Sequence, residues 1–212
     1  MYIYPICLTD VVLPDDEMEL VLSLDELARV RRMKNFSLRR SSLASRYALR
    51  CILAEHLVVD PAALQFGQGD KGKPYVISST SLEFNLSHSG DYLLIAVGSV
   101  PVGVDVEYVK PLPAYLQLAS RFFTSQEYAF IQASQTPLCA FYRVWTAKEA
   151  YVKALGIGLS SGLADFSVVE SGALVDSINN VYFHSVQWQE NCSAMVATVN
   201  AVECIHCTPR LG

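Results

Sequence analysis

Two carboxylates stand two residues apart in the segment Gly103-Val104-Asp105-Val106-Glu107. The valines around them are typical of a short buried strand. Because the side chains of a strand alternate between its faces, Asp105 and Glu107 are expected on one face, about 7 Å apart. Neighbouring carboxylates in apolar surroundings repel each other unless a cation joins them. Two interpretations stay open here: a site for a divalent ion such as Mg²⁺, or an edge strand whose polar face meets water.

A second charged pair, Glu149 and Lys153, is separated by four positions in Trp145-Thr146-Ala147-Lys148-Glu149-Ala150-Tyr151-Val152-Lys153. The apolar residues around the pair predict a largely buried helix, on which positions i and i+4 share a face. The pair can be an ordinary ion pair, worth about 0.2–0.5 kcal/mol. Alternatively, Glu149 can be a third ligand for a cation held by Asp105 and Glu107.

Candidate phosphate-binding groups occur in Asn85-Leu86-Ser87-His88-Ser89-Gly90 and in the turn Gly72-Lys73-Pro74. Hydroxyls, an imidazole and the N–H groups of a turn can bind an oxyanion. Glycine permits close backbone approach, and lysine supplies a point charge. A capping histidine and a solvated turn with lysines are the alternatives, and each motif alone leaves the choice open.

Basic residues are concentrated in one segment of an otherwise acidic chain, whose formal net charge is −5. Residues 29–50 contain eight of the 16 lysines and arginines and no acid, which predicts contact with an anion. The overall acidity argues against nucleic acid and favours a small phosphorylated ligand or an acidic protein. The eight residues are Arg29, Arg31, Arg32, Lys34, Arg39, Arg40, Arg46 and Arg50.

Hydrophobic periodicity and turn signals predict the elements that must position these groups. Capping boxes are expected at Ser23 with Glu26 and at Thr124 with Glu127. No apolar run reaches the roughly 18 residues of a membrane span, and residue 1 onward does not read as a signal peptide, so we expect a cytoplasmic protein with reduced cysteines. Helices are predicted at about 20–34, 40–57, 116–121, 125–132 and 138–155, and strands at the start of the chain and at 75–77, 82–86, 92–97, 103–107, 166–169, 182–187, 194–199 and 202–205.

A long helix followed by three strands occurs twice, in halves of nearly equal length. The predicted fold class is therefore α+β (α/β), with two pseudo-symmetric lobes that form a pseudo-dimer within one chain. Each lobe is expected to be a long helix packed on a small, mostly antiparallel sheet. Residues 1–102 would form the N-terminal lobe and residues 103–212 the C-terminal lobe, with the active site in the cleft between them.

Taken together, the motifs resemble the 4′-phosphopantetheinyl transferase superfamily, of the surfactin-synthetase-activating type. The resemblance is tight over about residues 70–160 and looser over the whole chain. The shorter, homotrimeric holo-acyl-carrier-protein synthases have about half this length and do not fit. The motifs are Gly72-Lys73-Pro74, Phe84-Asn85-Leu86-Ser87-His88-Ser89, Gly103-Val104-Asp105-Val106-Glu107, Arg121-Phe122-Phe123-Thr124-Ser125-Gln126-Glu127 and the stretch from Trp145 through Lys153 to Gly156-Ile157-Gly158-Leu159.

The resemblance implies a monomeric enzyme, a holo-[acyl-carrier-protein] synthase that uses coenzyme A and Mg²⁺. It would transfer 4′-phosphopantetheine to a serine of an apo acyl or peptidyl carrier protein, without nucleic acid or membrane partners. A Mg²⁺-dependent nucleotide or coenzyme A phosphohydrolase and a non-enzymatic coenzyme A-binding module are the alternatives.

The resemblance also implies roles for single residues. It makes Asp105, Glu107 and Glu149 the metal ligands, and Glu149, Lys153 and His88 the catalytic residues. Glu127 would be a further carboxylate of the cleft. The implied contacts of coenzyme A are Lys73, Gly72, Ser87, His88, Lys153 and, where the pattern is looser, Arg29, Arg32 and Arg46.

Overall fold

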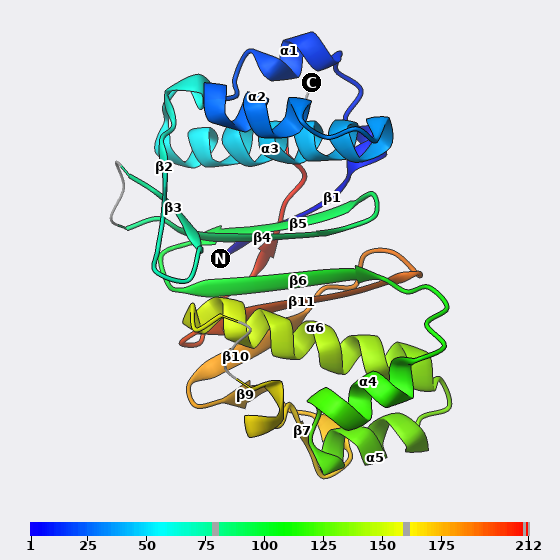
Figure 1. The fold of residues 1–212 in the computed structure, drawn as a ribbon. Coiled ribbons are helices and arrows are strands. Elements are labelled where there is room, and N and C mark those ends of the chain that lie inside the picture. Colours follow the sequence, from blue (N-terminus) through cyan, green and yellow to red (C-terminus); the bar gives the residue numbers. More distant parts are fainter. Residues whose placement is uncertain (78–80, 159–161, 210, 212) are drawn as a thin grey trace.

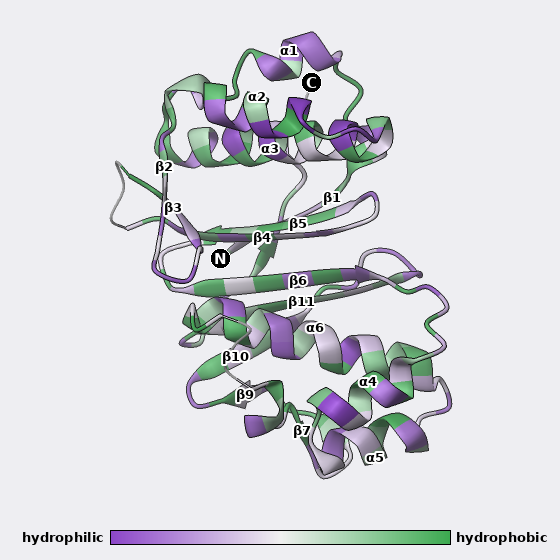
Figure 2. Ribbon diagram, viewed as in Figure 1, coloured by the Kyte–Doolittle hydropathy of each residue, from purple (hydrophilic) through white to green (hydrophobic). Residues whose placement is uncertain are grey.

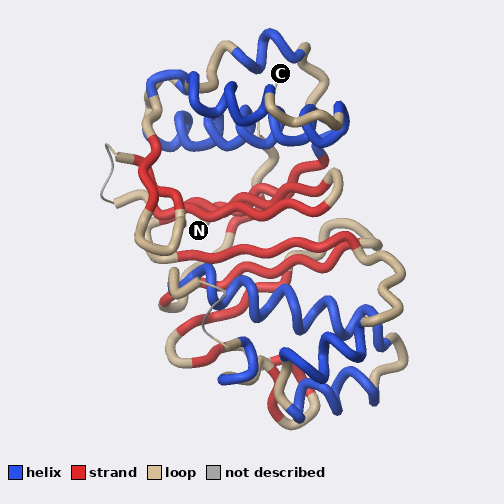
Figure 3. The backbone as a smooth tube through the Cα atoms, viewed as in Figure 1, coloured by secondary structure: helices blue, strands red, loops and turns tan. Residues whose placement is uncertain are grey.

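The computed structural model of the chain describes residues 1–77, 81–158, 162–209 and 211. It has two lobes, each with helices on the outside and a four-stranded sheet on the inside. The two sheets face each other between the two layers of helices (Figure 1 and Figure 3). The predicted α+β class with two similar lobes is therefore confirmed.

The first lobe is built on a sheet of order β12-β1-β5-β4, in which β5 is antiparallel to both of its neighbours. Helix α3 covers the outer face of this sheet, and α1 and α2 pack on α3 (Figure 1). The elements of this lobe before the second half of the chain are β1 (Tyr2–Cys7), the 3-10 turn η1 (Leu8–Asp10), α1 (Asp15–Glu19), α2 (Leu24–Arg31), α3 (Phe36–Leu57), the 3-10 turn η2 (Pro61–Ala63), β2 (Phe66–Gln68), β3 (Pro74–Val76), β4 (Glu83–Ser89) and β5 (Tyr92–Gly98).

Polar caps decide where the helices of this lobe begin. The predicted capping box at Ser23 is confirmed, since its hydroxyl accepts from the N–H of Glu26 and the Glu26 carboxylate accepts from the N–H of Ser23. Helix α3 begins about four residues earlier than predicted because the Asn35 side chain accepts from the N–H of Leu38 at 3.0 Å. It ends where Val58 adopts a left-handed conformation with φ of 56°.

The second lobe has an antiparallel sheet of order β6-β11-β10-β9. Helix α6 lies along the outer face of this sheet, with α4 and α5 packed on it (Figure 1). The predicted capping box of Thr124 and Glu127 starts α5, and Gly156, with φ of 65°, ends α6. The elements are β6 (Val102–Tyr108), α4 (Tyr115–Phe122), α5 (Ser125–Ala133), α6 (Pro137–Leu155), the 3-10 turn η3 (Leu163–Asp165), β7 (Val169–Glu170), β8 (Ala173–Leu174), β9 (Ser177–Ile178), β10 (Val181–Ser185) and β11 (Cys192–Val199).

Some predicted elements are wrong. Of the helix expected over residues 20–34, only Leu24–Arg31 is helical, as α2, because Ser23 caps the helix at its start; α1 (Asp15–Glu19), which was not predicted, lies before this range. Of the strand expected at residues 166–169, only Val169 lies in a strand, β7, and η3 ends directly before the expected range. The last strand, expected at residues 202–205, is β12 (Ile205–His206). Strands β2, β8 and β9 have only two or three residues each and carry no periodic pattern.

The last residues of the chain return to the first lobe. Strand β12 pairs in parallel with β1, and Leu211 packs against the core beneath α3. The C-terminus accordingly lies beside the helices of the first lobe (Figure 1). The prediction that residues 103–212 form the C-terminal lobe is therefore corrected at its end, since the last residues belong to the first lobe. Without β12, strand β1 would be an open edge of the sheet, and the tail of the chain covers that edge.

A third core joins the lobes, in addition to one core beneath the helices of each lobe. Its side chains come from the facing strands of both sheets, including Ile3, Leu94, Val104 and Val196. Figure 2 shows these inner strands as mostly hydrophobic. The seam between the lobes is therefore a packed hydrophobic layer.

Candidate active site

The carboxylates of β6 face helix α6, and a glycine brings the two elements together. A Cβ atom at Gly103 would overlap the carbonyl oxygen of Ala150 and the backbone nitrogen of Ala154 in α6. Strand alternation places Asp105 and Glu107 on the same side of β6 as Gly103, as predicted. The valines between them, Val104 and Val106, fill the core of the seam instead.

Asp105 is buried, with 4% of its surface exposed, and its two oxygens differ. Its Oδ1 accepts hydrogen bonds from Lys153 Nζ at 2.7 Å and from Ser87 Oγ at 2.8 Å. Its Oδ2 is the one buried side-chain polar atom of the described residues that has no hydrogen-bond partner. Burial raises the pKa of Asp105 above its usual value, although the Lys153 charge opposes the rise. The free oxygen is thus a buried acceptor in need of a donor or a cation.

Glu149 lies on the face of α6 that meets this strand, and 7% of its surface is exposed. Burial raises its pKa to about 7, and the negative charge of Asp105 adds to the rise, while Lys153 opposes it. The four-residue spacing of Glu149 and Lys153 therefore serves a buried site, and the interpretation as a mere surface ion pair is wrong. Both line a cavity of about 260 Å³ at the seam, together with Lys71, Gly72, Lys73, Asn85, Val152, Gly156 and Gly158.

Glu107 receives a hydrogen bond from the other lobe. Its Oε2 accepts from Ser89 Oγ at 2.7 Å, and Ser89 Oγ accepts in turn from the N–H of Tyr108 at 3.2 Å. Within the described part of the chain, no three His, Cys, Asp or Glu side chains are grouped closely enough to form a metal centre. The chemistry of the donors still suits a hard divalent cation, because Asp105 Oδ2 lacks a partner and the three carboxylates repel each other.

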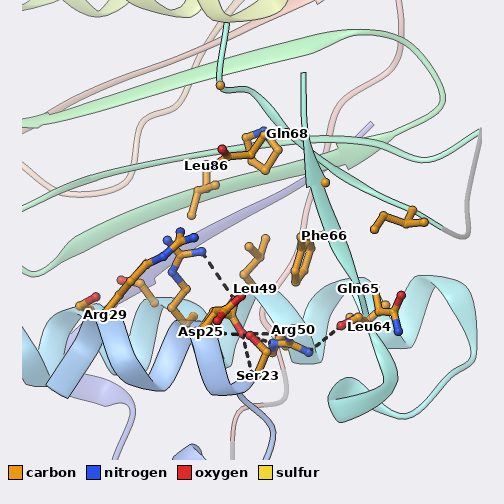
Figure 4. Close-up of a pocket in the computed structure, with 18 of the residues that line it drawn as sticks. Ser23, Asp25, Arg29, Leu49, Arg50, Leu64, Gln65, Phe66, Gln68 and Leu86 are labelled. Carbon is orange, nitrogen blue, oxygen red and sulfur yellow. Dashed lines mark hydrogen bonds and ion pairs between the residues drawn. The ribbon is translucent and has the colours of Figure 1, made fainter. Parts of the chain in front are cut away.

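A larger cavity of about 800 Å³ opens in the first lobe between α2, α3, the β2–β3 hairpin and β4. In Figure 4, Leu86 and Gln68 lie on one side of it, and Ser23, Leu49 and Arg50 on the other. Gly72 lines both this cavity and the smaller one at the seam. Four residues predicted to bind coenzyme A line the larger cavity: Arg29, Arg46, Gly72 and His88.

The arginines of this cavity differ in what they are free to do. Arg50 is fully buried, bonded to Glu26 and to the carbonyl oxygens of Pro61 and Leu64, so it holds the fold together. Arg46 is partly exposed and only 3.6 Å from Glu26, and Arg29 is exposed. Arg29 and Arg46 are thus the two arginines that can turn toward an anion in the cavity.

Other predicted residues lie elsewhere. Arg32 is absent from the lining of both cavities, and its Nε donates to the carbonyl oxygen of Ala28 at 3.1 Å. Lys73 lines the seam cavity, where its Nζ donates to the carbonyl oxygen of Val102 at 2.9 Å, and burial lowers its pKa. Ser87 is buried between Lys153 and Asp105 and lines neither cavity. Leu159, the last residue of the motif around α6, lies outside the described residues.

The expectation that Glu127 is a cleft carboxylate is wrong. Glu127 and Lys148 are both fully buried and form an ion pair of 2.8 Å inside the second lobe. Glu127 also accepts from the N–H groups of Thr124 and Val168, and Lys148 Nζ donates to the carbonyl oxygens of Leu163 and Phe166. The pair ties α5, α6 and the segment after η3 together.

Asn85 and Ser89 belong to the predicted phosphate-binding motif, but their hydrogen bonds to β6 were not predicted. The Asn85 Oδ1 accepts from the backbone N–H of Val104 at 2.9 Å, and Ser89 holds Glu107. The signal for both was present in the alternation of β4, since Asn85, Ser87 and Ser89 must share one face of that strand. The sequence alone did not show that this face of β4 lies against β6.

Comparison with known proteins assigns the chain to a family. Residues 16–100 match the family model described as "4′-phosphopantetheinyl transferase, N-terminal", and residues 101–198 match the "4′-phosphopantetheinyl transferase superfamily". A "4′-phosphopantetheinyl transferase" of Bacillus subtilis is 35% identical over 158 residues, which cover 73% of this chain and 69% of the relative. The chain belongs to the 4′-phosphopantetheinyl transferase superfamily, and the resemblance read from the motifs is confirmed.

Two further relatives carry names within the same family. The "4′-phosphopantetheinyl transferase HetI" of Nostoc sp. is 38% identical over 150 residues, covering 68% of this chain and 63% of the relative. The "4′-phosphopantetheinyl transferase Sfp" of Bacillus subtilis is 36% identical over 124 residues, covering 57% and 54%. The chain thus spans between about half and just over two thirds of these relatives' lengths.

A solved structure, the holo-[acyl-carrier-protein] synthase (AcpS) of Thermotoga maritima, matches with a TM-score of 0.40 and 21% identity, over 48% of this chain and 63% of that chain. This likeness is too distant to bear on the site. Within the described residues, no helix is long and apolar enough to cross a membrane.

Proposed function

We propose that this protein transfers 4′-phosphopantetheine from coenzyme A to a serine of an apo carrier protein and releases adenosine 3′,5′-bisphosphate. Family membership supports the reaction class. The observation that carries the proposal for this chain is the buried acid set at the seam, in which Asp105 Oδ2 has no partner and Glu149 has a pKa of about 7. Glu149 lines the seam cavity, which shares Gly72 with the 800 Å³ cavity of the first lobe, and the larger cavity is large enough for a nucleotide.

Coenzyme A would lie across the two cavities that share Gly72. The adenosine end, with its 3′-phosphate, fits the 800 Å³ cavity, where Arg29 and Arg46 supply positive charge. The diphosphate would then pass His88 and Gly72 toward Lys153. Because Gly72 has φ of 82° and open space where a side chain would be, its backbone can approach a phosphate closely.

Asp105, Glu107 and Glu149 are the residues that would hold Mg²⁺. Oxygen ligands from a few carboxylates, completed by substrate phosphates, are the usual environment of this ion in phosphoryl-transfer enzymes. When bound, Mg²⁺ supplies positive charge that stabilises the diphosphate as the leaving group departs.

The side chains of this site account for the remaining steps. The carrier serine Oγ attacks the β-phosphorus, and the bond from that phosphorus to the bridging oxygen of the diphosphate breaks. Glu149 accepts the serine proton: it lines the seam cavity, and burial raises its pKa to about 7 in the metal-free protein, near the value suited to a general base. Lys153 and His88 offset the negative charge of the phosphates.

The direct test is mass spectrometry of apo acyl and peptidyl carrier proteins incubated with the enzyme, coenzyme A and Mg²⁺. We expect one carrier or more to gain the mass of a phosphopantetheine group, with no gain when coenzyme A is left out. Breakdown of coenzyme A without a carrier would indicate the phosphohydrolase instead. Binding of coenzyme A without any reaction would indicate a binding module. A monomer in the cytoplasm remains the prediction for the state and location of the protein.

A further inference from the structure

Strand β4 of the first lobe has two faces with different partners. Phe84 and Leu86 join the core beneath α3, and Leu86 and His88 line the large cavity. The alternate residues, Asn85, Ser87 and Ser89, all form hydrogen bonds with β6 of the second lobe. One strand therefore presents both a wall of the cavity and a polar row directed at the carboxylates.

This polar row takes the place of a backbone ladder. Strands β4 and β6 are edge strands of two different sheets, and no pairing between them appears among the described strands. The side chains of β4 cross the gap instead: Asn85 Oδ1 accepts from the N–H of Val104, and Ser89 Oγ accepts from the N–H of Tyr108. The backbone of β6 is thereby fixed at two points, on either side of the acids.

The two serines of the row act on the acids in the same way. Ser87 Oγ accepts from Lys153 Nζ at 3.1 Å and donates to Asp105 Oδ1 at 2.8 Å. Ser89 Oγ accepts from Tyr108 N–H at 3.2 Å and donates to Glu107 Oε2 at 2.7 Å. A hydroxyl has one proton, so an N–H group on its oxygen leaves that proton free to point at the carboxylate. Each serine thus restrains one oxygen of one acid and leaves the other oxygen available.

We propose that Ser89 is a positioning residue for this site: through the bond of Ser89 Oγ to Glu107 Oε2, the first lobe orients a carboxylate of the second lobe toward the metal ion. This inference rests on the proposed function, because it takes Glu107 as a metal ligand. Partners that orient a ligating group typically change metal affinity by roughly 10- to 100-fold when they are removed. Ser89 itself touches neither the substrate nor the ion and acts only through Glu107.

The test measures metal binding directly, apart from turnover. Mn²⁺ is titrated into wild type and into S89A, S89T and S89C, and free Mn²⁺ is followed by electron paramagnetic resonance. We expect a dissociation constant roughly 10- to 100-fold higher in S89A, and recovery in S89T, which keeps the hydroxyl. Ser99, an exposed serine in the turn between β5 and β6, provides the matched control S99A, which should bind as wild type does.

The outcomes separate this inference from the proposed function. If wild type itself binds no Mn²⁺ or Mg²⁺, the metal-dependent function fails. If wild type binds the ion and S89A binds equally well, Ser89 has no positioning role, even when the variant melts at a lower temperature. If S89A does not fold, the comparison of S89C with S89T decides, since a thiol is a weak donor of nearly the same size and should bind the ion less tightly than the threonine variant does.

Discussion

Replacing Glu149 with glutamine should abolish turnover and at the same time stabilise the metal-free protein above neutral pH. The structure holds this carboxylate in a buried position beside Asp105, and its pKa rises from 4.5 to about 7. A carboxylic acid whose pKa is higher in the folded state is neutral in both states at low pH, and it costs stability once the pH exceeds the pKa of the unfolded state. The loss should therefore grow between about pH 4.5 and pH 7 and stay constant above that range.

The size of the effect follows from the shift. At 1.36 kcal/mol per pKa unit, a rise from 4.5 to about 7 corresponds to about 3 kcal/mol at pH 8. Glutamine resembles the neutral acid in shape and cannot ionise, so Glu149→Gln should be free of this loss. We expect the variant to be more stable than wild type at pH 8 by about 2–3 kcal/mol, and nearly equal to it at pH 5.

The assay is urea denaturation in EDTA at pH 5 and pH 8, combined with turnover on a carrier protein in Mg²⁺. Glu190→Gln, at an exposed position of the second lobe, is the matched control and should change neither quantity. Equal stability differences between wild type and Glu149→Gln at the two pH values would refute the buried, charge-coupled environment described for Glu149. Turnover at the wild-type rate would remove it from the chemistry.

Three further predictions concern other parts of the molecule. Arg46→Ala should weaken the binding of coenzyme A by about tenfold or more, the effect of one charge-assisted hydrogen bond, and should leave the affinity for 3′-dephospho-coenzyme A unchanged. Calorimetry with both ligands measures the two affinities, and an equal loss for both would place the 3′-phosphate elsewhere. Lys148→Met should cost about 3–5 kcal/mol in urea denaturation because it leaves Glu127 buried and unpaired, and adding Glu127→Leu should recover part of the loss; a fully additive double variant would contradict the pairing. Burial lowers the pKa of His56, which is hydrogen-bonded to the Tyr4 hydroxyl. As the pH drops below 6.5, His56 is protonated in the unfolded chain before it is protonated in the folded protein, so the free energy of unfolding should fall. Denaturation at pH 5 and pH 7.5 should show that His56→Gln lacks this part of the pH dependence.

Two neighbouring residues of α6, Lys148 and Glu149, serve different purposes. In the sequence, Lys148 and Glu149 are neighbours in the same helix. In the structure they point to different partners: Lys148 enters the core of the second lobe, whereas Glu149 faces the seam. The helical rotation of about 100° per residue separates them, so adjacent charges contribute separately to stability and to the site.

Local rules predicted much of the fold. Capping boxes at Ser23 and Thr124 mark true helix starts, because a cap depends only on residues three positions apart. Strands β4, β5, β6 and β11 were found within a few residues of their ends, since their apolar residues are dense. Short strands such as β8 and β9 were missed, because two residues carry no period and such strands form only when a neighbouring strand is already in place.

For the site, too, local patterns predicted one part and tertiary contacts decided the rest. The sequence alone determined which groups could do chemistry, since Asp105 and Glu107 share a strand face, and Glu149 and Lys153 share a helix face, by backbone geometry alone. Only the tertiary structure decided which of these groups meet: Gly103 lets α6 approach β6, and the lobes bring Ser87 and Ser89 against the acids. It also assigned Glu127 to the core and carried the chain's last strand back to the first lobe. Such contacts join residues far apart in the chain, and their energies depend on burial and partners that no local pattern contains.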